Sequence, residues 1–113
     1  MTEELTPPNA DATWNSVAPG IEKRLLRAHA DGGGTYVLRF PFAANTRFPA
    51  HAHLGGEDLY VLSGQVTVGQ RTLSAGDFLW TPLGGVNSVY AVRDSELLVV
   101  APRGVELQEG HER

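Results

Sequence analysis

The chain has no cysteine, and this absence excludes several classes of site at once. Disulfides, thiolate zinc sites, CxxC redox centres and cysteine nucleophiles all need a thiol. A protein-bound metal must therefore use histidine, carboxylate, amide or water ligands. Histidines and carboxylates that lie close together in the sequence become the first features to look for.

Long hydrophobic runs and basic charge are also scarce. The aliphatic stretch from Leu97 to Ala101 is five residues long, far short of the roughly 20 that cross a bilayer, so we interpret it as a buried strand and expect no membrane partner. Nine Lys and Arg against thirteen Asp and Glu give a formal net charge of -4, the wrong sign for a nucleic-acid partner. The acidic start of the chain lacks the basic residues and apolar core of a secretory signal. We therefore expect a cytoplasmic protein.

Glycine, proline and short apolar runs are abundant instead. The 113 residues suffice for one domain. The 42% of hydrophobic residues lies above the disordered range, and the 13 glycines and 7 prolines are too many for a helical bundle. Runs of Val, Leu, Tyr and Phe alternate with Gly, Asn or Asp about every eight to twelve residues. This rhythm predicts an all-β, single-domain fold, a small antiparallel β-barrel or jelly roll.

The composition divides the chain into an N-terminal arm over 1–12, a β-domain over 13–107 and a frayed tail over 108–113. Residues 21–30 and 35–42 are expected to pair as a hairpin, because the intervening glycines supply the backbone angles of a tight turn. A helix over 21–30 is the alternative, but ten residues between Pro19-Gly20 and three glycines fit a strand pair better. Further strands are expected over 58–62, 65–68, 78–82, 86–92 and 96–101.

One histidine-rich segment has the pattern of a metal site. His51 and His53 are two residues apart, and in an extended strand such residues project from the same face. Glu57 follows two glycines that let the chain reverse and bring a carboxylate back toward the histidines. Two imidazoles and a carboxylate suit Fe(II), Mn(II), Ni(II) or Zn(II). Two solvated histidines on a surface strand are the alternative, and it remains open at this point.

These positions resemble the two motifs of the cupins, G-x5-H-x-H-x3,4-E-x6-G and G-x5-P-x-G-x2-H-x3-N. The matching positions are His51, His53, Glu57 and Gly64 in the first motif and Gly76, Pro82 and Gly84 in the second. The chain is thus similar to the RmlC-like cupins. The resemblance implies a small β-barrel with a metal site in its mouth, a small-molecule ligand or substrate, and a homodimer.

Within the cupins, HAHLGGEDLYVLSG and TWNSVAPGIEKRLL resemble the group that contains ChrR-type anti-sigma cupin domains and 2,4'-dihydroxyacetophenone dioxygenases. The chain departs from the motifs at three positions. Asn45 replaces the opening glycine, which is mild because Asn tolerates left-handed backbone. Ala91 replaces the closing Asn, and Asn87 replaces the histidine that is the family's fourth ligand.

Asn87 matters most for function, because an amide oxygen is a weaker ligand than imidazole. The resemblance then implies a metal held by His51, His53 and Glu57, with Asn87 as a weak ligand or as the group that orients bound water or substrate. A set of two histidines and one carboxylate is the arrangement of non-haem Fe(II) oxygenases, so Fe(II) is favoured over Mn, Ni or Zn. A cupin that has abandoned metal is the alternative.

Other residues are weaker candidates. An apolar pocket could be lined by Tyr60, Phe78, Trp80 and Tyr90, although aromatic residues in strands usually serve packing. Arg39 and Arg47 could hold an anionic substrate, but a solvated strand face is the favoured interpretation. His29 and His111 are expected in solvent, and Asp77 is expected to serve its turn.

Two function classes follow from the resemblance. In the first, the chain is a metal-dependent dioxygenase that acts on a small oxygenated organic molecule. In the second, it is a ChrR-like module that senses a ligand or oxidant without catalysis. The enzyme is slightly favoured, because a free-standing barrel with an accessible site most simply acts on what enters it.

Overall fold

The computed structural model describes residues 13–42, 47–53, 56–82, 86–103 and 105–107. For residues 47–53, 86–87 and 105–107 it describes the backbone alone. The expected N-terminal arm and C-terminal tail lie outside the described residues. His111, Asn45 and Gly84 lie outside them as well.

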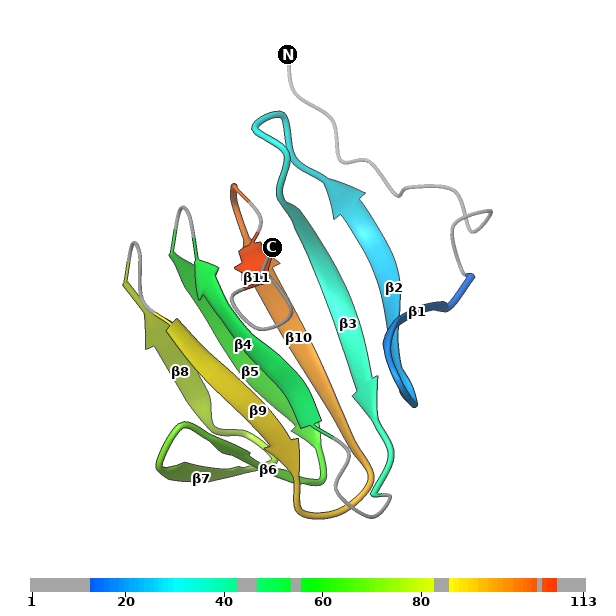
Figure 1. The fold of residues 1–113 in the computed structure, drawn as a ribbon, viewed down its shortest axis with the longest axis vertical. Helices are drawn as coiled ribbons and strands as arrows, with labels where there is room; N and C mark the ends of the chain where they lie inside the picture. The colour runs from blue at the N-terminus through cyan, green and yellow to red at the C-terminus, as the bar shows by residue number, and fades with distance from the viewer. Residues whose placement is uncertain (1–12, 43–46, 54–55, 83–85, 104, 108–113) are drawn as a thin grey trace.

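The described residues form antiparallel strands in two sheets (Figure 1). The six-stranded sheet has the order β1-β2-β3-β10-β5-β8 and the five-stranded sheet the order β11-β4-β9-β6-β7. The strands are β1 (Asn15–Ala18), β2 (Ile21–Ala28), β3 (Gly34–Phe40), β4 (Arg47–His53), β5 (Glu57–Ser63), β6 (Gln65–Val68), β7 (Arg71–Ser74), β8 (Phe78–Thr81), β9 (Val86–Ala91), β10 (Ser95–Ala101) and β11 (Val105–Leu107).

Strict alternation of buried residues fixes which face of each sheet is the core. In β3 and β10 every second residue is buried, as expected for strands with one face in the core and one outside. Tyr36 pairs with Val99, and Val99 pairs with Leu59, so one buried row crosses three strands. The five-stranded sheet contributes Val66, Val68, Leu73, Val89 and Ala91 to the same core.

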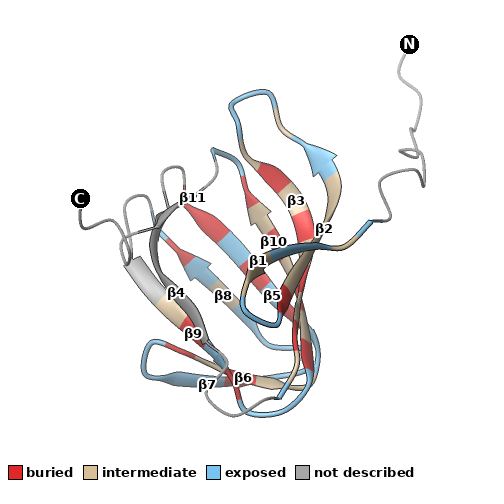
Figure 2. Cartoon of the chain, turned by 45° about the vertical axis from the view of Figure 1, so that its right-hand side comes forward, coloured by how far each residue is buried: buried red, intermediate tan, exposed pale blue. Residues whose placement is uncertain are grey.

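The two sheets face each other as the layers of a jelly roll, with buried residues on the facing sides (Figure 2). They are not closed into a continuous barrel, because the described edge strands β8, β1, β11 and β7 end each sheet. The all-β prediction is therefore confirmed in its jelly-roll form. No helix of the described residues is long and apolar enough to cross a membrane.

The predicted hairpin is present, because β2 pairs with β3 antiparallel over most of its length. The helical alternative for 21–30 is thereby excluded. The expected later strands also form, with ends that shift by at most one residue. Sequence reasoning missed β1 and β7, two four-residue strands at sheet edges.

Candidate functional site

The backbone of β4 and β9 places two of the predicted ligands opposite each other. His51 pairs with Asn87 across the two antiparallel strands. Asn87 lies two residues before Val89, which is only 2% exposed and belongs to the core. Positions i and i+2 share a face, as do directly paired positions. His51 and Asn87 therefore occupy core-facing positions of the five-stranded sheet.

A β-bulge in β4 determines which residues of this strand lie on the core-facing side of the sheet. Phe48 pairs with Val89 and His51 with Asn87, so β4 advances three positions while β9 advances two. In a regular strand, positions three apart lie on opposite faces, and the extra residue puts both on the same face. Pro49 lies within the bulge, and bulges are among the few places in a sheet where proline, which has no N–H, is found. His53, two residues past His51 in the same strand, shares its face.

Glu57 is the first residue of β5, in the opposing six-stranded sheet. It is 5% exposed and lies on the same face as Leu59 and Val61, which belong to the core. Gly56 before it has φ of 82°, a left-handed conformation that glycine adopts without strain. Because Glu57 is four residues from His53, their Cα atoms are at most about 14 Å apart. β4 belongs to one sheet and β5 to the other, so the end of β4 that carries His53 and the start of β5 that carries Glu57 are consecutive along the chain.

Tyr36 of β3 is a neighbour of Glu57 that sequence reasoning missed. Its side chain is 8% exposed, and burial raises the pKa of its phenol well above 10.0, with a further increase from the negative charge of Glu57. The phenol therefore stays protonated and can donate a hydrogen bond at neutral pH. The alternation of Tyr36 with Leu38 and Phe40 is the sequence signal that could have placed it inside.

Lys23 of β2 approaches the same tyrosine. Its Nζ atom lies 4.5 Å from the centroid of the Tyr36 ring, within cation–π range. The register of β2 places Lys23 opposite Leu38, a core residue, so this lysine lies on the core-facing side of the sheet. Sequence reasoning passed over Lys23 because it sits among other basic residues of a strand with no visible alternation.

The donor chemistry fits a divalent metal. Two imidazoles and a carboxylate can bind Fe(II), Mn(II), Ni(II) or Zn(II), and the carboxylate of Glu57 is buried on the core side of β5. No cluster of three or more His, Asp or Glu occurs among the side chains that the structure describes, a set that does not include His51 or His53. The fit therefore rests on the strand positions, the burial of Glu57 and the ligand types.

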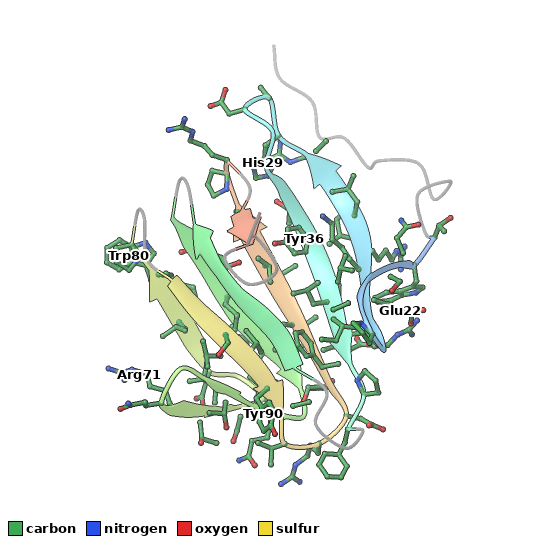
Figure 3. The ribbon with its side chains drawn as sticks, viewed as in Figure 1. Glu22, His29, Tyr36, Arg71, Trp80 and Tyr90 are labelled. Atoms are coloured by element: carbon green, nitrogen blue, oxygen red, sulfur yellow. The ribbon has the colours of Figure 1, made fainter. Side chains whose placement is uncertain are left out.

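The aromatic candidates lie away from Glu57. In β5, Glu57, Leu59 and Val61 are buried while Tyr60 is 42% exposed, so Tyr60 lies on the outer face of the sheet. Tyr60 pairs with Phe78, and Trp80 pairs with Asp58 on that outer face. Phe78 and Trp80 are 58% and 63% exposed. Tyr90 is also exposed, and Figure 3 shows it and Trp80 at separate places on the molecule.

The remaining polar candidates have local partners. Arg39 forms an ion pair with Glu22 at 3.0 Å, and its guanidinium stacks 3.7 Å from the centroid of the Trp14 ring. These contacts explain the presence of Arg39 on the face of its strand. His29 contacts the hydroxyl of Thr35 at 2.8 Å. Asp77 accepts a hydrogen bond from the backbone N–H of Ser74 at 2.8 Å, so it serves its turn. The side chain of Arg47 lies outside the described set.

Comparison with known protein families gives one match that spans almost the whole chain. The family is described as the ChrR cupin-like domain, and it matches residues 2–106. No curated protein matches the chain.

Solved structures with the same fold come from several proteins. KdgF from Halomonas sp. is 23% identical with a TM-score of 0.67, and the match covers 85% of this chain and 93% of KdgF. An acetylacetone dioxygenase from Acinetobacter johnsonii is 16% identical with a TM-score of 0.68, covering 95% and 74%. A chain of the Rhodobacter sphaeroides complex of SigE with the anti-sigma protein ChrR is 22% identical with a TM-score of 0.70. That match covers 81% of this chain and 49% of the other, so this chain spans about half of it. At these identities the likeness concerns the fold.

Proposed function

This chain belongs to the family of ChrR cupin-like domains, and from that premise we propose that it is a metal-dependent dioxygenase of a small oxygenated organic molecule. The observation that supports the proposal is the position of Glu57 and of the histidine strand on the facing sides of the two sheets. A buried carboxylate faces the core from one sheet, and His51 and Asn87 occupy core-facing positions of the other. Structural likeness to an acetylacetone dioxygenase supports the reaction class.

In this proposal His51, His53 and Glu57 hold the metal, and Asn87 stands where a further ligand or a water-orienting amide would be. Fe(II) suits two histidines and one carboxylate with open positions, and Mn(II), Ni(II) or Zn(II) also suit these donors. When bound, the metal supplies a Lewis acid and, as Fe(II), a centre for dioxygen chemistry.

The chain's own residues have separate tasks. Tyr36, like any tyrosine, keeps its proton at neutral pH, so its phenol donates a hydrogen bond to an oxygen of the bound molecule, and burial raises its pKa further. The core residues Leu59 and Val99 lie in the same row as Tyr36 and keep bulk water from this side of the site. Glu57, buried at the start of β5, supplies negative charge that offsets the charge of the metal.

The first test is the metal content of the untagged protein, by elemental analysis before and after anaerobic addition of Fe(II). We expect about one equivalent for a single mononuclear site. The His51→Ala/His53→Ala variant should lose this metal while its circular dichroism spectrum stays that of the folded chain. His29→Ala is the matched control, since His29 contacts Thr35 instead, and it should keep its metal. Full metal content in the double variant would place the site elsewhere and sink the assignment.

Sensing without catalysis is the second candidate, favoured by the family's description and by the likeness to the ChrR complex. Oxygen uptake by the Fe(II)-loaded protein separates the two functions. Small hydroxyketones, β-diketones and phenols are the substrates to test first. Uptake above that of His51→Ala/His53→Ala would support the dioxygenase. Metal binding and ligand binding without uptake would favour the sensor.

A further inference from the structure

A cavity of about 410 Å³ opens beside Tyr36, between β2, the β2–β3 turn and the end of β10. Its lining comes from Lys23, Leu25 and Ala28 of β2, the glycines at 32–34, Tyr36 and Arg103. Tyr36 lies in one buried row with Val99 and Leu59, and Glu57 lies two residues before Leu59 on the same face of β5. The cavity and Glu57 therefore lie on the same face of the six-stranded sheet.

Glycine 33 allows this cavity to form. A Cβ at Gly33 would overlap the carbonyl oxygen of Ala101 and the backbone of Pro102. Only a glycine lets the β2–β3 turn approach the end of β10 this closely. That close approach brings Arg103, the residue after Pro102, into the lining of the same cavity as Lys23.

The charges on the lining all have one sign. Lys23 and Arg103 are its two charged residues, and both are cations. The ion pair between Arg39 and Glu22 involves neither of them, and Lys23 contacts the ring of Tyr36. Asp31 lies in the neighbouring turn but is not part of the lining. The net charge of the chain is -4, yet both charged residues of this lining are cations, and the phenol donor of Tyr36 lines the same cavity.

The remaining lining is apolar or backbone. Leu25 and Ala28 offer aliphatic contact, and the turn glycines offer peptide groups without side chains. A cavity with apolar walls and a few convergent polar groups is the usual form of a small-molecule site. Arginine and lysine together are suited to bind a carboxylate, and charge-assisted hydrogen bonds make such contacts strong.

We propose that this cavity binds the carboxylate of a small organic acid, with Lys23 and Arg103 contacting the anion and Tyr36 donating a hydrogen bond to it. Leu25 and Ala28 contact the carbon skeleton. The acid is then the substrate or ligand of the neighbouring metal centre, and this last step rests on the proposed function. Binding of the carboxylate itself does not depend on the metal.

Another described cavity provides a useful contrast. It measures about 220 Å³ and is lined by Arg39 together with Asp94 and Glu96. Arg39 is already paired with Glu22, and the two carboxylates disfavour an anion. The two cavities share no lining residue, so only the one beside Tyr36 has the charge for an acid.

The test is a titration of benzoate into chelator-treated protein, followed by ¹H–¹⁵N NMR. We expect the amide signals of Gly32 and Gly33 to shift, because these residues line the cavity. Benzamide, which has the same shape without the charge, should leave them unshifted. In Lys23→Gln/Arg103→Gln the dissociation constant for benzoate should rise at least about tenfold, since two charge-assisted contacts are lost. Tyr36→Phe should weaken binding by a smaller factor.

Arg71→Gln is the matched control variant, because Arg71 is an exposed cation on β7, in the other sheet (Figure 3). It should bind benzoate as tightly as the unaltered chain. Equal affinity in Lys23→Gln/Arg103→Gln, or equal shifts with benzamide, would overturn the proposal. His51→Ala/His53→Ala should keep its benzoate affinity, and Lys23→Gln/Arg103→Gln should keep its metal. A chain that binds no metal but binds benzoate at Gly33 would refute the proposed function and leave this inference standing.

Discussion

At the scale of single residues, burial on the core face of β3 changes the acid–base behaviour of Tyr36. Desolvation disfavours the phenolate, and the carboxylate of Glu57 disfavours it further, so the pKa of Tyr36 rises above 10.0. Lys23, 4.5 Å from the ring centroid, contacts the face of the ring and would favour the phenolate. Burial dominates over this contact, and the raised pKa follows.

The raised pKa of Tyr36 makes the fold sensitive to alkali. Below pH 10 the phenol is protonated in both folded and unfolded chains, and its contribution to stability is fully present. Above pH 10 the unfolded chain releases this proton first, so the free energy of unfolding falls by up to about 1.4 kcal/mol per pH unit, until the folded pKa is reached. Urea unfolding at pH 8 and pH 11 measures this loss, and Tyr36→Phe should show a smaller loss between the two pH values.

An absorbance titration checks the same prediction without unfolding. The difference between the unaltered chain and Tyr36→Phe near 295 nm isolates the phenolate of Tyr36, and it should develop only well above pH 10. A difference spectrum with a midpoint at pH 10 would contradict the raised pKa. Tyr60→Phe, on the outer face of β5, is the control for general effects of losing a tyrosine.

The ligand spacing was visible in the sequence because His51, His53 and Glu57 are close along the chain. The sequence contained no sign of the cavity lined by Lys23, Tyr36 and Arg103, because these residues come from three segments that only the fold brings together. The aromatic character of Tyr60 and Trp80 and their alternation along the strands made them candidates for a pocket, with packing as the alternative. Their strand positions alternate with those of buried Leu59 and half-buried Leu79. The structure shows which face of the sheet is the core, and Tyr60 and Trp80 lie on the other face.

At the scale of elements, the bulge in β4 controls the site more than the length of the strand does. Without it, Phe48 and His51 would occupy opposite faces, and one of them would leave the core side. The sequence contained Pro49 as a sign of irregular pairing. It did not reveal which strand would pair with β4, and the bulge exists only relative to β9.

The turn between β5 and β6 requires a glycine at position 64. Gly64 has φ of 85°, and a Cβ there would meet the carbonyl oxygen of Asp94 and the side chain of Ser95. The hydroxyl of Ser95 in turn accepts a hydrogen bond from the N–H of Gln65 at 2.9 Å. The turn is thus held against the β9–β10 connection.

We predict that Gly64→Ala lowers the free energy of unfolding by more than about 2 kcal/mol, because left-handed strain and steric overlap add together. Gly69→Ala is the matched control: Gly69 has φ of 61° with no atom within 4 Å of the added Cβ, so only strain of about 1 kcal/mol applies. Urea denaturation of both variants measures the difference. Equal losses would show that the contact with Asp94 and Ser95 carries no cost.

At the scale of the whole molecule, the sandwich explains why the general architecture was predictable and the site only partly so. Alternating apolar residues and glycine turns predict strands, and their number predicts two layers. Which strand faces which follows from long-range pairing such as β3 with β10. The candidate site lies between strands of different sheets, so its full set of residues depends on that pairing.

The edge of the six-stranded sheet that β8 forms has an uncharged, aromatic surface. β8 is its last strand, and its four residues, Phe78 to Thr81, include no charge and no proline. Natural edge strands usually carry such residues to prevent pairing with another chain. Phe78 and Trp80 are 58% and 63% exposed beside Tyr60 of β5. No strand of the described residues pairs with the outer side of β8, and this edge together with the aromatic face favours a partner that supplies another strand.

We predict that a second copy of the chain pairs here, β8 against β8, as the homodimer expected from the sequence. An antiparallel strand pair has the two-fold symmetry that a homodimer interface needs, and it would bring the exposed aromatics of both copies together. Sedimentation velocity should give twice the mass of the chain. Phe78→Lys/Trp80→Lys should sediment at the mass of a single chain, because like charges would then face each other across the axis.

Phe42→Lys is the control for this variant, since Phe42 is an equally exposed aromatic beyond the end of β3. It should remain dimeric and keep the unfolding midpoint of the unaltered chain, because its altered side chain is exposed. Phe78→Lys/Trp80→Lys should keep the circular dichroism spectrum of the folded chain, since Phe78 and Trp80 are exposed in the single chain. A dimer that survives Phe78→Lys/Trp80→Lys would place the interface on another edge. A single-chain mass for the unaltered protein at micromolar concentration would remove the dimer itself and leave the aromatic surface of β8 to a different partner.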